Sequence, residues 1–128
     1  MESIKDEIIR GNMKWLVGRC LNYIDLGVEP GISDDRYSKK EVLKKLFEEK
    51  IYGIRNVMYT MEKNQIIEKM DVIFQGLLED LMKLIITAIS EEDRRENFRD
   101  LLMERVEEMK SKLNQDLEYI QRDKHLEE

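Results

Sequence analysis

The chain has 128 residues, enough for one domain that buries about two-thirds of its unfolded surface. Apolar residues make up 41% and charged residues 39%, with one proline, six glycines and a net charge of −6. The abundance of Glu, Leu, Lys, Ile and Met predicts an all-α protein, and the acidic total argues against nucleic-acid binding over the whole surface.

The first predicted helix covers residues 4–26. Ser3 is a suitable N-cap and Gly27 a suitable C-terminal stop. Gly11 and Gly18 lie seven residues apart on roughly one face, which either lets another helix approach closely or reflects a tolerant surface. Trp15 is expected in the core, with a role as an interface anchor as the alternative.

Residues 27–38 form the one predicted loop, because Pro30-Gly31 and Ser33-Asp34-Asp35 are typical turn sequences. At about 12 residues it is longer than most helix-to-helix connections. The Ser33-Asp34-Asp35 segment could contact a cation, but its composition is more typical of a turn and a helix cap.

Two predicted helices follow, over residues 39–63 and 65–89, the first opened by a Ser38–Glu41 capping box. Only Glu62 to Gln65 separates their apolar stripes, and no proline or glycine lies between them. The stripe centre turns by roughly 160° between the two segments, at 100° per residue. A turn near Asn64 is therefore favoured over one continuous helix, which would leave a three-helix protein.

The last predicted helix covers residues 91–124 and opens with a Ser90–Asp93 capping box. Its apolar positions repeat at steps of four and three residues: Phe98, Leu102, Val106, Met109, Leu113, Leu117 and Ile120. Its length of about 50 Å exceeds the roughly 36 Å diameter of a spherical domain of this size. The bundle is therefore elongated or this helix projects, and a projecting apolar stripe predicts self-association, together with the apolar segment 77–89.

No residue pattern points to catalysis, and no cofactor or metal is expected. His125 is the only histidine and lies three residues from the end, a poor position for a general base or a metal ligand. Cys20 is the only cysteine, so neither an intramolecular disulfide nor a thiolate metal cluster can form, which favours the cytoplasm. The longest apolar run, nine residues from Leu81 to Ile89, falls short of the ~20 residues that span a bilayer.

The predicted helix 39–63 carries the main basic feature. Residues 39–64 contain seven Lys and Arg against four Asp and Glu. Lys40, Lys44 and Arg55 fall near one face, with tyrosines close by in sequence, a combination that suits phosphate contact and base stacking. Glu41 and Glu48 dilute this patch.

These observations together predict an elongated four-helix bundle that acts as a non-catalytic interaction or scaffold protein, a homodimer or a subunit of a larger assembly. The alternative is a small nucleic-acid-associated subunit that uses the basic face. Eight methionines are expected in the core, with an adaptable partner groove as the alternative. The Glu, Lys and Arg content is typical of thermophilic proteins and equally of long exposed helices.

Overall fold

A computed structural model describes residues 2–27 and 39–126, with side chains for 2–26 and 40–120. Four helices make up this part of the chain: α1 (Ile4–Gly27), α2 (Lys39–Tyr59), α3 (Lys63–Ala88) and α4 (Glu92–Leu126). No strand occurs within the described ranges. The predicted all-α, four-helix architecture is confirmed, while the loop predicted over 27–38 lies outside the described residues except for Gly27.

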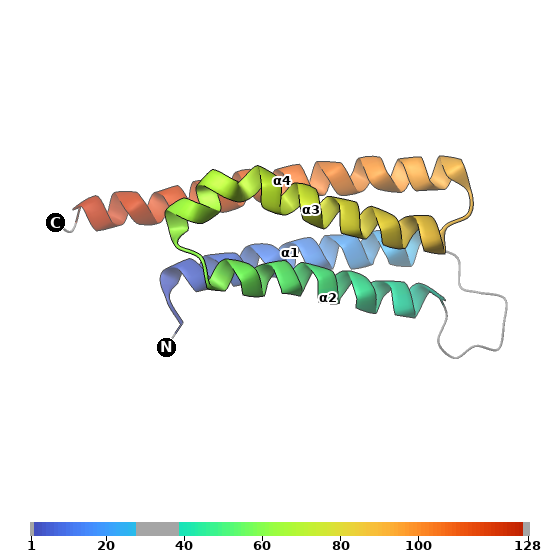
Figure 1. The fold of residues 1–128 in the computed structure, drawn as a ribbon, viewed down its shortest axis with the longest axis horizontal. Helices are drawn as coiled ribbons and strands as arrows, with labels where there is room; N and C mark the ends of the chain where they lie inside the picture. Colours follow the sequence, from blue (N-terminus) through green and yellow to red (C-terminus); the bar gives the residue numbers. More distant parts are fainter. Residues whose placement is uncertain (1, 28–38, 127–128) are drawn as a thin grey trace.

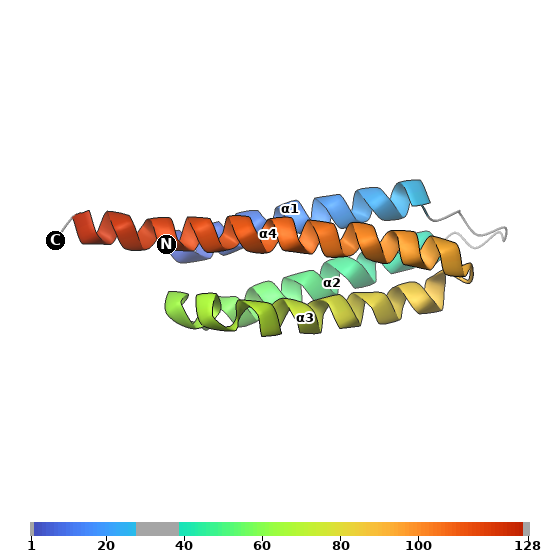
Figure 2. The same cartoon turned by 90° about the horizontal axis from the view of Figure 1, so that it is seen from above.

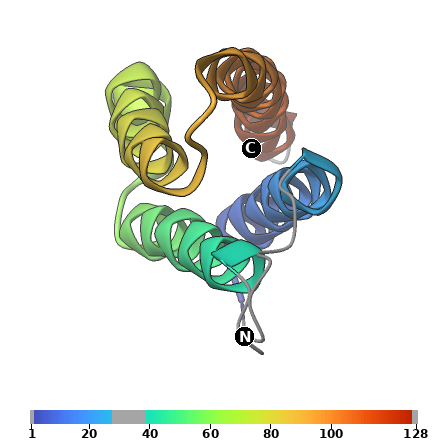
Figure 3. The same ribbon diagram turned by 90° about the vertical axis from the view of Figure 1, so that its right-hand side faces the viewer.

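The four helices run up and down in turn and occupy the four corners of an elongated bundle (Figures 1 and 3). Each helix packs against the helix before it and the helix after it, and α4 closes the ring against α1. Short connections between neighbours impose this order, because only three residues separate α2 from α3 and three separate α3 from α4.

A continuous apolar core runs along the axis, with every helix contributing side chains at steps of three and four residues. Phe47 of α2 and Phe98 of α4 meet across it edge to face, with ring centroids 6.1 Å apart and planes at 74°. This geometry is the favourable one for aromatic pairs. Asn12 is the one buried polar residue among the described side chains.

The turn between α2 and α3 comes slightly earlier than the predicted position near Asn64, at Thr60 to Glu62. Two features stabilise it there. The Lys5 ammonium of α1 donates to the carbonyl oxygens of Tyr59 (3.2 Å) and Met61 (2.6 Å), and the Glu62 amide donates to the side-chain oxygen of Gln65 at 3.1 Å. The break lets α3 turn its apolar stripe back toward the same core.

Helix α4 has 35 residues, whereas α1, α2 and α3 have 24, 21 and 26. At 1.5 Å per residue α4 is about 52 Å long and the others about 31 to 39 Å. Both expectations for its length are therefore realised: the bundle is elongated, and the last turns of α4 extend beyond α2 and α3 (Figures 1 and 2).

Candidate interaction surface

The apolar stripe of α4, predicted to mediate self-association, packs inside the chain's own bundle. Six of its seven residues are buried, with exposed fractions of 4% or less, and Ile120 is partly buried against the same core: Phe98, Leu102, Val106, Met109, Leu113, Leu117 and Ile120. The other three helices are long enough to cover this stripe, so no second copy is needed for that purpose. In this conformation the stripe lies in the core and is not exposed to a second copy.

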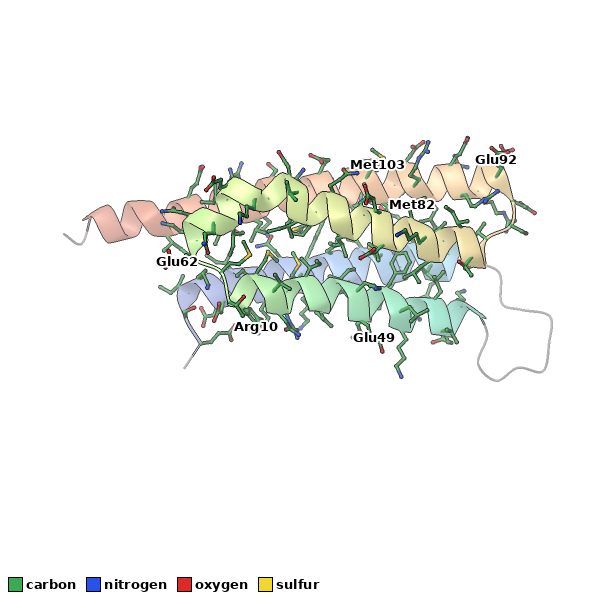
Figure 4. All side chains as sticks on the ribbon, in the orientation of Figure 1. Arg10, Glu49, Glu62, Met82, Glu92 and Met103 are labelled. Atoms are coloured by element: carbon green, nitrogen blue, oxygen red, sulfur yellow. The ribbon has the colours of Figure 1, made fainter. Side chains whose placement is uncertain are left out.

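The apolar segment 77–89 is likewise mostly inside. Leu77, Leu81, Ile85 and Ile89 are buried, and Ile86 is the well-exposed exception at 56%. Ile86 and Met82 line a shallow groove together with Arg95 and Arg99 of α4. Met82 lies on α3 and Met103 on α4 (Figure 4), and most of the other described methionines belong to the core.

The three basic residues singled out from the sequence are engaged within the bundle. Lys40 donates to the main-chain oxygen of Asp25 at 2.6 Å, and Lys44 pairs with the Asp25 carboxylate at 2.9 Å, which raises the pKa of the Lys44 ammonium. The Arg55 guanidinium lies over the rings of Tyr52 (4.2 Å) and Tyr59 (5.7 Å). Lys40 and Lys44 thus meet at the end of α1, while Arg55 lies farther along α2.

The described residues hold no group of three or more His, Cys, Asp or Glu placed to bind a metal. Cys20 is buried, and burial raises the pKa of its thiol to about 12, so the thiol stays protonated near neutral pH. The side chain of His125 and the Ser33-Asp34-Asp35 segment lie outside the described residues.

Helix α1 carries a second stripe, on the side opposite its core stripe. Its positions follow one another at steps of four and three residues within an arc of roughly 80°. This outer seam consists of Ile4, Ile8, Gly11, Trp15, Gly18, Asn22 and Leu26. None of the seven is charged, in a chain in which 39% of residues are. Ile4 and Leu26 are 63% and 80% exposed, and Ile8 and Trp15 are partly buried.

The two glycines of the outer seam leave open space on the helix surface. A Cβ atom added at Gly11 or at Gly18 would meet no heavy atom within 4 Å. The Arg19 guanidinium lies 5.4 Å from the centre of the Trp15 ring, and Trp15 is partly buried and packs against the core. The seam therefore alternates large apolar side chains with gaps.

Two contacts define how α4 lies beside the outer seam. Asn12 donates to the Asp116 carboxylate at 3.3 Å, and Arg105 donates to the Tyr23 hydroxyl at 2.6 Å. In both pairs the residue numbers add to 128, so the antiparallel register of the two helices is the same along this length. Lys112 and Tyr119 of α4 therefore lie roughly level with residues 16 and 9 of α1.

The sequence offered two signals for this surface, the spacing of Gly11 and Gly18 and the presence of Trp15. Apolar spacing alone does not separate this seam from the core stripe, because Ile8 and Ile9 are adjacent and both contact the core. Ile9 and Met13 are fully buried, whereas Ile8 and Trp15 pack against the same core and stay partly exposed, as the core expectation for Trp15 implies.

Comparisons with protein-family models, with curated proteins and with solved structures found nothing that matches this chain. Within the described ranges, no helix combines the length and the apolar character that crossing a membrane requires.

Proposed function

We propose that the protein is a cytoplasmic, non-catalytic interaction protein that self-associates through its helices. The observation that carries this proposal is the outer seam of α1, where Ile4 and Leu26 are exposed and Trp15, which packs against the core, keeps part of its surface open. A helix that only completes a bundle needs one apolar stripe, whereas a helix with two opposite stripes is typical of one that packs against partners on both sides.

The remaining exposed apolar side chains support the seam as the main surface. Val42, Leu46 and Val57 of α2 also share one side, but Glu49 and Lys50 interrupt them (Figure 4 labels Glu49). Val72, Ile86 and Met103 are spread over α3 and α4. The outer seam runs the length of α1 without a charged residue.

Sedimentation velocity from about 1 to 500 µM in moderate salt tests self-association, because a weak homodimer dissociates by mass action within this range. The weight-average sedimentation coefficient is expected to rise with concentration. A monomer throughout the range would contradict the proposal. Moderate salt is needed because the net charge of −6 makes two copies repel each other at low ionic strength.

A further inference from the structure

Helix α1 differs from the other three helices in how its position along the bundle axis is fixed. Three residues separate α2 from α3 and three separate α3 from α4, whereas the eleven residues 28–38 separate α1 from α2. Three extended residues span about 10 Å, the distance between neighbouring helices, and eleven span up to about 36 Å. The short connections therefore fix α2, α3 and α4 against one another, while the long connection does not fix the register of α1.

The apolar core stripe of α1 is compatible with one other register. After a move of α1 by four residues toward its N-terminal end, each core position receives another apolar residue. The places of Ile9, Met13, Leu16, Val17 and Cys20 are then taken by Met13, Val17, Cys20, Leu21 and Ile24. The opposite move would place Lys5 and Asn12 in the core, where a charge and an amide without partners are costly to bury.

We propose that Asn12, through its hydrogen bond to Asp116, selects the observed register of α1 over the one shifted by four residues. Asn12 is 5% exposed, and its amide nitrogen donates to the Asp116 carboxylate of α4 at 3.3 Å. After the move Leu16 would occupy this place, and the partly buried carboxylate would face an apolar side chain that donates nothing. One buried polar side chain at a helix–helix contact is known to specify register in this way.

Two contacts nearer the ends of α1 favour the same register. The Lys5 ammonium donates to two carbonyl oxygens of the connection between α2 and α3, and the Tyr23 hydroxyl accepts from Arg105 at 2.6 Å. A move of four residues displaces α1 by about 6 Å and breaks both contacts. The ion pair between Lys44 and Asp25 is more exposed, so solvent screening makes its contribution smaller.

This selection lowers the stability of the fold. The side-chain oxygen of Asn12 is buried without a hydrogen-bond partner, which an apolar residue at this position would avoid. The register also determines where the outer seam lies, because its exposed residues Ile4 and Leu26 move with α1 relative to α4. The inference concerns a single copy and does not depend on self-association.

Exchanging two residues of α1 tests the proposal. The double variant Asn12→Leu with Leu16→Asn has the composition of the parent, but its asparagine meets Asp116 only after the move of four residues. In the observed register this asparagine would occupy the place of Leu16, which is fully buried in the core. We therefore expect α1 of this variant to shift by about 6 Å along the axis.

The distance between two spin labels reports the register. Labels are attached at Glu7→Cys on α1 and Glu96→Cys on α4, both exposed positions, while Cys20 is buried and stays unlabelled. The register given by Asn12–Asp116 separates them by about 25 residues along the axis, or roughly 40 Å in space. Double electron–electron resonance, on labelled chains diluted with unlabelled chains, should give one distance for the parent. The exchange variant should give mainly a distance longer by about 5–6 Å.

A second variant removes the polar contacts without placing an amide in the core. It combines Lys5→Met, Asn12→Leu and Tyr23→Phe. Its matched control makes the same three kinds of change at exposed positions, Lys14→Met, Asn22→Leu and Tyr119→Phe. The second variant is expected to show both distances, with the longer one in at least a tenth of the molecules, and the control only the parent distance.

Far-UV circular dichroism verifies that each variant is folded. A parent that shows both distances overturns the proposal, as does a folded exchange variant that keeps the parent distance. If the exchange variant does not fold, the second variant decides, because a folded chain with only the parent distance would mean that other contacts fix the register of α1.

Discussion

Replacing Gly11 or Gly18 with alanine should stabilise the folded chain. A glycine inside a helix costs about 1 kcal/mol relative to alanine, because the unfolded chain loses more conformational freedom on folding. Neither position is under steric restraint, since an added Cβ meets nothing within 4 Å and no described glycine has a positive φ angle. The free energy of unfolding is therefore expected to rise by about 1 kcal/mol for each substitution.

For a chain of this length the unfolding entropy is roughly 0.27 kcal/mol per kelvin, so each substitution should raise Tm by about 4 °C. Urea unfolding and thermal melting, followed by circular dichroism near 2 µM, measure the monomer. Gly53→Ala and Gly76→Ala are the controls and should gain the same amount. A loss of stability confined to Gly11→Ala and Gly18→Ala would refute the reasoning, because it would mean that a single copy already covers this side of α1.

Three further predictions concern the core. Leu113→Ala should lower the free energy of unfolding by about 2–5 kcal/mol at any protein concentration, because Leu113 is fully buried within one copy. A variant that changes self-association in sedimentation but not the free energy of unfolding would show that Leu113 lies at an interface between copies. Asn12→Leu should raise the free energy of unfolding by about 1 kcal/mol in urea titrations, because its buried carbonyl oxygen has no hydrogen-bond partner; a loss of stability would mean that the bond to Asp116 outweighs this cost. Because the folded thiol of Cys20 keeps its proton up to a pKa of about 12, the unfolded state releases it first as pH rises. The chain should therefore lose roughly 1–2 kcal/mol relative to Cys20→Ala between pH 8 and pH 10; parallel pH profiles would show that Cys20 is not buried.

The helices themselves were readable from the sequence because their apolar periodicity is strong. The α4 positions from Phe98 to Leu117 are core residues as their spacing indicated. The phase change between α2 and α3 revealed a break that no proline or glycine marks, because one straight helix cannot present both stripes to one core.

The sequence did not reveal which helix or which copy of the chain covers each apolar stripe. Periodicity says that Leu102 and Leu113 need a partner, and it is silent on whether that partner is another helix of the same chain. The length of α4 relative to a spherical domain predicted that its stripe needs a second copy. The other three helices are long as well, so they form an elongated bundle that covers most of α4. The exact turn also depended on a contact distant in sequence, the Lys5 ammonium on the carbonyls of Tyr59 and Met61.

That contact makes the two ends of the bundle unequal. At one end, Lys5 ties the first turn of α1 to the connection between α2 and α3. At the other end, Lys40 and Lys44 bind Asp25 of α1, but Tyr23, Leu26, Phe98 and Leu101 border an open pocket of about 480 Å³. Local opening should therefore begin at the pocket end, and amide hydrogens should exchange faster near Ile24 and Phe98 than near Ile9 and Met58.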